Sequence, residues 1–329
     1  MKKIRWGILS TAKIGVQKVI PAIQKSRYCE VRAIGSRTLK KARAAAKTLG
    51  IPKAFGSYDE IINDPEIEAV YNPLPNHLHV PWCMKALDAG KHVLCEKPIS
   101  LDAVQARELL DYSQKYPGLK IMEAFVYRHH PQWQKIPQLV AGGKIGTLKT
   151  ITSFFSYPKL DSSNYRNYPE MGGGGLMDIG CYCISVSRFM FGREPERVFG
   201  IAEPDPEFGV DGMTSAILDF GCGTATFTSA TQLSLYQSLD LYGTEGCISI
   251  PAPFGAPLDQ PCRFFLHRKQ RSKEIVIGAC NQFTIQAELF ARAILEDKDV
   301  FTPLSDGVAN MKVIDAVFRS SETGTWQTM

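Results

Sequence analysis

The first third of this 329-residue chain alternates short apolar runs with segments of helical periodicity. Short aliphatic runs bounded by polar residues predict buried strands, and the Ala-, Lys- and Arg-rich segments between them predict helices. We expect strands over residues 4–9, 30–35, 67–72, 92–95 and 120–125, and helices over 13–25, 39–49, 58–63, 77–89 and 102–115. Parallel strands need a crossover connection, usually a helix, so this order predicts a doubly wound parallel sheet in an α/β fold.

The pattern changes near residue 123, where runs of period-2 alternation replace the strand–helix rhythm. We expect strands over 150–157, 197–202, 213–220, 223–231, 238–241 and 264–267, and helices over 176–191, 283–295 and 305–321. Gly221-Cys222-Gly223 predicts a hairpin turn, and residues 269–273 predict a hairpin tip in water. The sequence therefore predicts two domains, 1–122 and 123–329, the second an α/β domain with an open, mainly antiparallel sheet.

Charge and cysteine content argue against several classes of protein. The net charge of +5 is small and no basic stripe is present, which argues against nucleic acid as a partner. No apolar run is long enough to span a membrane, and the run after the first basic residues is too short for a signal peptide. The nine cysteines are odd in number and form no Cys-x-x-Cys pair, so we expect reduced thiols in a cytoplasmic protein. Neither the cysteines nor His77-x-His79 and His129-His130 have the spacing of a metal site, and we expect no metal.

The turn after the first strand has the small residues of a dinucleotide-binding loop. Such a loop needs small residues at relative positions 1, 3 and 6, so that the backbone approaches the pyrophosphate at the helix N-terminus. These positions hold Ser10, Ala12 and Gly15, of which only one is glycine. The predicted cofactor contacts in this turn are Ser10, Thr11, Ala12, Lys13 and Ile14. The alternative is an ordinary strand-to-helix turn with a Ser or Thr cap.

The end of the second strand favours NADP over NAD. A site for NAD usually places Asp or Glu here, to accept a hydrogen bond from the ribose 2′-hydroxyl. This chain has Ser36 and Arg37, with Lys40 and Lys41 one turn later. A guanidinium pairs with a 2′-phosphate, which a carboxylate would repel. We therefore expect Ser36, Arg37 and Lys41 to contact NADP, with NAD as the alternative cofactor and a solvated basic helix start as the alternative structure.

Lys97 follows a buried strand at the edge where a ligand is expected. The apolar run His92–Cys95 stops at Glu96-Lys97-Pro98, and Pro98 prevents the strand from continuing directly into a helix. In an open α/β sheet, ligands bind at the carboxyl ends of the strands, so Lys97 can point at a cofactor. A surface lysine in a turn is the alternative for an isolated Lys-Pro pair.

Four motifs, in order along the chain, carry a resemblance to a known family. They are Ser10-x-Ala12-x-x-Gly15, Pro75-Asn76-x-x-His79, Glu96-Lys97-Pro98 and Gly172-Gly-Gly-Gly-Leu-Met-Asp178-Ile-Gly180-Cys-Tyr182. Over essentially its whole length, the chain resembles the glucose–fructose oxidoreductase/inositol dehydrogenase/rhizopine catabolism (GFO/IDH/MocA) family. Residues 123–131 add to the similarity with the branch of trans-1,2-dihydrodiol dehydrogenase and D-xylose dehydrogenase.

The resemblance implies a Rossmann domain and a second α/β domain that meet at a cleft for nicotinamide and sugar, with a dimer formed through the outer face of the second sheet. It assigns Lys97 and Asp178 to catalysis. It assigns to the cofactor Pro73, Asn76, His79, Glu96 and Lys97, with Asn76 near the nicotinamide ribose. Many members have histidine four residues after the aspartate, whereas Tyr182 stands here, as in the dihydrodiol dehydrogenase branch, where tyrosine is the usual acid/base. The glycine-poor first loop is a second departure.

Lys97, Asp178 and Tyr182 have the functional groups that alcohol oxidation needs. The cofactor takes the hydride, so the protein must handle the proton. Asp178 and Tyr182 are four residues apart and share one face of a helix. Tyr182, with a reference pKa of about 10, needs a nearby cation such as Lys97 to act near neutral pH. Lys97 could equally carry the proton, and Asp178 could orient Lys97 or accept from a sugar hydroxyl. The simpler alternatives are a half-buried aromatic at Tyr182 and a helix-start carboxylate at Asp178.

The sequence thus predicts an NADP(H)-dependent oxidoreductase that acts on the hydroxyl or carbonyl carbon of a sugar, cyclic polyol or diol. Arg128 and Arg166 are further candidates for substrate contact. The alternatives are a keto-sugar reductase and a non-catalytic, NADP-sensing regulatory protein, and the three catalytic candidates argue against the latter. The apolar residues of 213–220 and 223–231 cannot all face inward, so we also expect a homodimer or a dimer of dimers.

Overall fold

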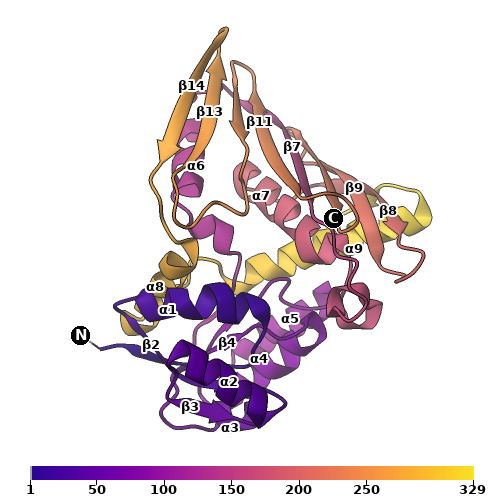
Figure 1. The fold of residues 1–329 in the computed structure, drawn as a ribbon. Coiled ribbons are helices and arrows are strands. Elements are labelled where there is room, and N and C mark those ends of the chain that lie inside the picture. Colours follow the sequence, from indigo (N-terminus) through magenta and orange to yellow (C-terminus); the bar gives the residue numbers. More distant parts are fainter. Residues whose placement is uncertain (1) are drawn as a thin grey trace. The chain divides into compact units, whose positions relative to one another are not determined.

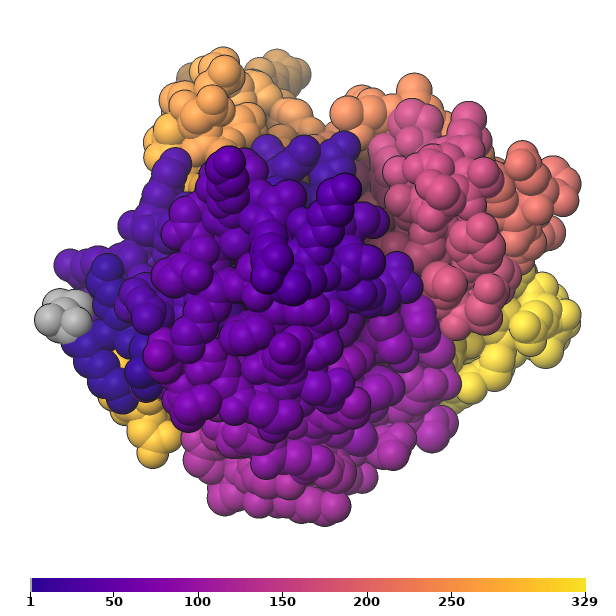
Figure 2. Space-filling model, turned by 60° about the horizontal axis from the view of Figure 1, so that its bottom comes forward, coloured from indigo at the N-terminus to yellow at the C-terminus, as the bar shows by residue number. Residues whose placement is uncertain are grey.

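The computed structural model describes residues 2–329 and divides into two compact units. Unit 1 runs to Val126 and resumes over Asn281–Val308, and unit 2 comprises Tyr127–Cys280 and Ala309–Met329. In Figure 2 the N-terminal part of unit 1, coloured indigo to purple, faces the viewer. The sequence interpretation placed 281–308 with the second half of the chain, whereas this segment lies in unit 1.

Unit 1 is built on a parallel sheet of six strands in the order β3-β2-β1-β4-β5-β6. Its strands are β1 (Ile4–Ile8), β2 (Cys29–Gly35), β3 (Lys53–Phe55), β4 (Ala69–Asn72), β5 (His92–Cys95) and β6 (Ile121–Glu123). Its helical segments are η1 (Gly15–Val19), α1 (Ile20–Lys25), α2 (Leu39–Leu49), α3 (Tyr58–Ile62), η2 (Asn76–Leu78), α4 (His79–Asp88), α5 (Ala103–Ser113) and α8 (Gln282–Leu295). The predicted doubly wound parallel sheet is confirmed. β3 was not expected, because three residues are too few for a periodicity to show.

Side chains of β1, η1, α1 and α8 form a core cluster of unit 1. Trp6 of β1 is fully buried, and Val19, Ile20 and Ile23 belong to the same apolar cluster. Phe290 of α8 completes the cluster, with its ring centroid 5.6 Å from that of Trp6. The apolar stripe of α8 needs this partner surface, which explains why a segment late in the sequence joins unit 1.

Unit 2 is built on a sheet of nine strands in the order β14-β13-β12-β11-β7-β10-β9-β8-β15. β7 and β10 pair in parallel, and the other pairs are antiparallel. The strands are β7 (Leu148–Ser156), β8 (Arg197–Pro204), β9 (Asp211–Asp219), β10 (Thr224–Ala230), β11 (Tyr236–Gly243), β12 (Cys247–Ile250), β13 (Cys262–Arg268), β14 (Arg271–Ile277) and β15 (Gln327–Thr328). Figure 1 shows α6 (Gln132–Ala141), α7 (Cys181–Phe191) and α9 (Leu304–Thr323) on one side of this sheet. The expected open, mainly antiparallel sheet is confirmed.

Short helical segments complete the chain. They are η3 (Val126–His129), η4 (Tyr165–Asn167), η5 (Pro169–Met171) and the π-helical η6 (Leu176–Gly180), which runs directly into α7. No helix within residues 2–329 has the length and apolar character needed to cross a membrane.

Both predicted hairpin turns are confirmed. The Phe220 amide donates to the Gly223 carbonyl at 2.9 Å, and Gly221 between them has a left-handed φ of 71°. The second tip consists of Lys269 and Gln270, which separate the paired residues of β13 and β14. β14 was not expected, because its first four residues are exposed and polar and show no alternation.

Candidate functional site

The turn between β1 and η1 is shaped by Ser10 and ends in exposed residues. The Ser10 hydroxyl accepts a hydrogen bond from the Ala12 amide at 3.0 Å, so the side chain shapes the turn itself. Lys13 and Ile14 are exposed. A Cβ added at Gly15 would meet only ordinary contacts, at 3.6 Å from the Tyr71 ring and 3.8 Å from Pro73. The protein's own packing therefore does not require glycine at position 15, whereas close approach of a pyrophosphate would.

Residues after β2 offer positive charge at the same edge of the sheet. β1 and β2 are parallel neighbours, so their carboxyl ends lie side by side. Ser36 is buried, and Arg37 and Lys41 are exposed. A small residue followed by a solvated guanidinium fits a ribose 2′-phosphate, and no carboxylate stands where NAD would need one.

His79 contacts the backbone of the turn that carries Lys97. Lys97 follows β5 and is half-buried, and the Lys97–Pro98 peptide is cis. The imidazole of His79 is fully buried, with Nδ1 2.7 Å from the Pro98 carbonyl oxygen and Nε2 2.8 Å from that of Leu74. Burial lowers the pKa of His79 to about 4, although the two carbonyls act in the opposite direction. A neutral ring donates to only one of them, and the ring bridges the two turns.

This placement differs from the sequence interpretation of His79 as a cofactor contact, because both of its ring nitrogens face backbone carbonyls inside unit 1. Asn72 ties the same region together, since its amide nitrogen donates to the His79 carbonyl at 3.2 Å. Glu96 accepts a hydrogen bond from the Tyr71 hydroxyl at 2.5 Å, and Asn76 is 4% exposed. Hydrogen bonds through His79 thus connect the turn of residues 73–79 to the turn of residues 96–98.

In unit 2, Asp178 is paired with a cation. Its Oδ1 lies 2.8 Å from Nε of Arg166, and its Oδ2 accepts a hydrogen bond from the Tyr157 hydroxyl. Burial opposes the charge of Arg166, but Asp178, with Tyr165 and Tyr157, outweighs it and raises the pKa of Arg166. Arg166 and Asp178, singled out separately in the sequence, are therefore direct partners. Tyr157 was missed, since a tyrosine at the end of a predicted strand gives no signal of its own.

Tyr182 lies in the first turn of α7, within a cluster of aromatic rings. Its ring centroid is 5.7 Å from that of Tyr127, 5.9 Å from Phe155 and 5.5 Å from Phe254. The loop of Phe254 is fixed, because the Gln237 side-chain oxygen accepts from the Phe254 amide at 3.1 Å. Rigid rings on several sides restrict the direction of the Tyr182 phenol. The three partners come from distant segments, so no local pattern indicates that they surround this tyrosine.

Arg128 lies buried in unit 2 rather than at an open surface. Its Nη2 donates to the Ser185 hydroxyl at 2.9 Å and to the Ser185 carbonyl at 3.3 Å, and its Nε donates to the Tyr127 hydroxyl at 3.3 Å. These bonds tie η3 to α7. They favour a structural role over the substrate contact that the sequence interpretation considered.

The glycines before η6 serve close packing within the protein. A Cβ at Gly173 would overlap the Arg166 carbonyl, and one at Gly174 would overlap the Asp211 carboxylate. Gly174 also has a φ of 107°, which other residues rarely adopt. The sequence interpretation was that this run lets the helix start close to a ligand. Within the protein, the neighbours that these glycines admit are the Arg166 loop and Asp211.

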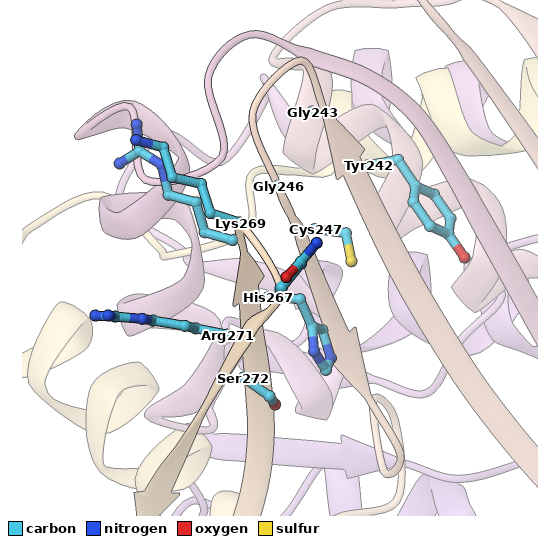
Figure 3. Close-up of a pocket in the computed structure, with 10 residues that line it drawn as sticks. Tyr242, Gly243, Gly246, Cys247, His267, Lys269, Arg271 and Ser272 are labelled. Carbon is cyan, nitrogen blue, oxygen red and sulfur yellow. The ribbon is translucent and has the colours of Figure 1, made fainter.

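A separate cavity lies at the edge of the sheet in unit 2. It has a volume of about 550 Å³ and is lined by residues of β11, β12 and the β13–β14 hairpin, among them Tyr242, Cys247 and His267. Figure 3 shows Lys269 and Arg271 extending away from the strands, so this is an open hollow beside a hairpin tip. It contains none of the predicted catalytic residues. Within residues 2–329, no group of three or more His, Cys, Asp or Glu side chains could hold a metal ion.

Comparison with known proteins assigns the chain to a family. Residues 4–124 match the oxidoreductase family with an NAD-binding Rossmann fold, and residues 133–249 match the GFO/IDH/MocA C-terminal domain. An uncharacterized oxidoreductase of Rhizobium meliloti is 43% identical over 335 residues, covering 100% of both chains. The D-xylose 1-dehydrogenase (NADP(+)) 2 of Haloferax volcanii is 36% identical, covering 97% of this chain and 98% of the relative.

Solved structures agree with these relatives. The 3-ketoreductase KijD10 from Actinomadura kijaniata, in complex with NADP and TDP-benzene, superimposes with a TM-score of 0.92 at 28% identity, covering 97% of this chain and 98% of that one. The resemblance to this family, to the branch that includes D-xylose dehydrogenase and to its fold is confirmed. The chain belongs to the GFO/IDH/MocA family of oxidoreductases and carries that family's NAD-binding Rossmann domain.

Proposed function

We propose that the protein is an NADP(H)-dependent oxidoreductase that interconverts a hydroxyl and a carbonyl group in a sugar, cyclic polyol or diol. The observation that carries the proposal is Lys97, a half-buried amine at the carboxyl end of β5, in a turn that His79 holds in place. A fixed ammonium at that edge suits a reacting oxygen, whose negative charge rises as its proton leaves. The names of the relatives, an NADP(+)-dependent xylose dehydrogenase and a 3-ketoreductase with NADP, support the same class.

The residues of unit 1 fit NADP. The backbone from Ser10 to Ile14 would hold the pyrophosphate, and Gly15 leaves room for its approach. Arg37, with Ser36 and Lys41, would hold the 2′-phosphate. The nicotinamide half would be bordered by Pro73, Asn76, Glu96 and Lys97. His79 would keep their turns in place through its contacts with the Pro98 and Leu74 carbonyls. When bound, the cofactor supplies the site that accepts or donates the hydride.

Proton transfer is then the task of this chain's own residues. Lys97 donates a hydrogen bond to the substrate oxygen and favours its deprotonated form. Tyr182 is the candidate acid/base, with its phenol held by the surrounding rings. Asp178 acts on the site through Arg166 and Tyr157, to which both of its oxygens are bonded. Kinetics of variants at the two positions distinguishes proton transfer by Lys97 from proton transfer by Tyr182.

The domain assignment and the assembly belong to the same proposal. Residues 1–122 bind the cofactor, and 123–329 supply the substrate-binding residues and an oligomerisation face. That face is the side of the unit 2 sheet where Ile201 is 63% and Ile217 39% exposed, and both line a hollow of about 360 Å³ together with Phe199. Apolar side chains of this kind need cover. We propose that a second copy covers them, as a homodimer or within a dimer of dimers, which light scattering at micromolar concentration tests.

A reducing compartment suits the cysteines. All nine are free thiols, and six of them are buried. We therefore place the protein in the cytoplasm, where such thiols stay reduced. A keto-sugar reductase remains the second candidate, favoured by the ketoreductase name of the structural relative. The third candidate, an NADP-sensing regulator without catalysis, predicts cofactor binding with no turnover of any sugar.

A substrate screen tests the proposed function. The purified protein is incubated with aldoses, inositols, diols and keto sugars, each with NADP⁺ or NADPH, and absorbance at the nicotinamide band is followed. We expect turnover of at least one member of these classes with the NADP pair. Cofactor binding without turnover of any of them would favour the regulatory alternative.

A further inference from the structure

A buried carboxylate lies at the start of the helical stretch that carries Asp178 and Tyr182. Asp211, the first residue of β9, is 7% exposed. One of its oxygens, Oδ2, accepts hydrogen bonds from the Leu176 amide and from the Thr214 hydroxyl, both at 2.6 Å. Leu176 is the first residue of η6. Asp211 therefore ties the first turn of this helix to the sheet.

The neighbouring glycines are fitted to this carboxylate. Gly174 has a φ of 107°, which residues with a side chain rarely adopt, and a Cβ there would collide with the Asp211 carboxylate. A Cβ at Gly175 would lie 3.3 Å from the Asp211 carbonyl oxygen and 3.4 Å from its Oδ2. Two consecutive residues thus lack side chains where the carboxylate fits against the backbone. The glycines make room for the Asp211 carboxylate, and the carboxylate bonds the Leu176 amide at the start of η6; we call this arrangement the anchor.

Helix capping alone does not account for a carboxylate at this position. Burial raises the pKa of Asp211 to about 6, against the lowering effect of Thr214 and the nearby amides of Leu176, Asp211 and Gly175. The groups that donate hydrogen bonds to the Asp211 carboxylate are a hydroxyl and amides, not a cation. Burial of a carboxylate without a cation beside it is unfavourable. Asparagine or serine would cap a helix without that penalty. A charged carboxylate accepts a stronger hydrogen bond from the Leu176 amide than a neutral group would, so it fixes the first residue of η6 more firmly.

We propose that Asp211 is a positioning residue: its carboxylate holds the wide turn of η6 and thereby directs Asp178 and Tyr182. The inference rests on the proposed function of those two residues. A π-helical turn is wider than an α-turn, so it changes the relative directions of side chains at positions 178 and 182. Without the anchor, we expect η6 to relax toward a regular α-turn. Asp178 then loses its contact with Arg166, and the Tyr182 hydroxyl moves.

Asp211→Asn tests this inference with little change in volume. Asp205→Asn is the matched control, because the Asp205 Oδ1 also accepts two amides, those of Glu207 and Phe208 at 2.9 Å, and both belong to its own turn rather than to η6. We expect Asp211→Asn to keep its fold and its Kd for NADPH while kcat falls on the order of 10²-fold, as for a small misplacement of reacting groups. Asp205→Asn should keep kcat within about 2-fold, which is the behaviour of a group with only a structural role.

Crystal structures of both variants give a second readout that does not depend on turnover. We expect η6 to change and the Asp178–Arg166 contact to lengthen in Asp211→Asn only. The inference is overturned if Asp211→Asn keeps both the contact and the parent kcat, or if the two variants lose kcat equally. If the unmodified protein turns over no substrate, the proposed function fails, and an unchanged η6 in Asp211→Asn would still refute the inference on its own.

Discussion

The carboxylate of Asp178 and the guanidinium of Arg166 form an ion pair within unit 2, with Oδ1 2.8 Å from Nε. The Asp178 side chain is 10% exposed and that of Arg166 28%. Since Tyr157 bonds the second carboxylate oxygen, Asp178 joins three segments: the helical stretch η6, the loop around η4 and the end of β7. Replacement of any one of the three side chains should therefore disturb the other two.

Arg166→Ala should destabilise unit 2 and weaken catalysis together. Loss of one partner from a buried pair costs about 3–5 kcal/mol, and partial exposure of Arg166 reduces this to about 1–3 kcal/mol in unfolding free energy. A double-mutant cycle with Asp178→Asn measures the coupling between the two side chains. The Arg197–Asp219 pair, with an N–O distance of 2.9 Å and Arg197 53% exposed, is the control and should show a smaller coupling. Equal couplings for the two pairs would contradict the account.

Arg37→Ala should remove the preference for NADPH over NADH. We expect the unmodified protein to bind NADPH more tightly by about 10-fold or more, which corresponds to about 1.4 kcal/mol. The guanidinium is solvated and pairs with the 2′-phosphate only when NADPH is bound, so its loss should leave the affinity for NADH unchanged. Fluorescence titration with both cofactors measures this. Equal affinities in the unmodified protein would refute the role of Arg37.

Gly15→Ala should separate folding from cofactor binding. The added methyl group meets only ordinary contacts, at 3.6 Å and 3.8 Å, and alanine is favoured over glycine in a helix by up to about 1 kcal/mol. Thermal unfolding should therefore show equal or higher stability. The Kd for NADPH should rise by about 10-fold, because the methyl group occupies the path of the pyrophosphate. An unchanged Kd would place the pyrophosphate elsewhere.

The sequence predicted the elements that have a strong period and missed those that depend on tertiary packing. β5 and α2 have the expected boundaries, because aliphatic runs and helical stripes are local signals. α6 was missed, since Pro137 lies within it and interrupts its helical pattern. The place of α8 in unit 1 depends on the contact between Phe290 and Trp6, which no local pattern encodes.

The same limit applies to the candidate site. Lys97, Asp178 and Tyr182 stand in motifs, so the sequence could single them out. The bonds that fix them could not be predicted, because His79 reaches Pro98 across 19 residues and Asp211 reaches Leu176 across 35. The sequence interpretation assigned His79 to the cofactor and the glycines to a ligand, and it did not include the partners that both have inside the protein.

Stability should fall as the pH is lowered from about 6.5 toward 4. Burial lowers the pKa of His79 to about 4 and that of His129 to about 3, so between 6.5 and those values only the unfolded chain takes up these protons. Each histidine contributes a loss of up to about 1.4 kcal/mol per pH unit. Asp211 acts in the opposite direction, because its raised pKa lets the folded state take up a proton below about 6. Urea unfolding of the parent and of His129→Gln should show the shallower slope in the variant, and identical slopes would contradict the assignment.

The central claim is that Lys97 acts on the reacting oxygen and not on cofactor affinity. The most direct measurement compares kcat and the Kd for NADPH between the unmodified protein and Lys97→Met, on a substrate found in the screen. Methionine keeps the unbranched chain as far as Cε and removes the charged amino group. We predict a kcat at least about 10³-fold lower, within the range for a positioned acid/base, with a Kd for NADPH within about 3-fold of the parent. A Lys97→Met variant that turns over at the parent rate would contradict the account.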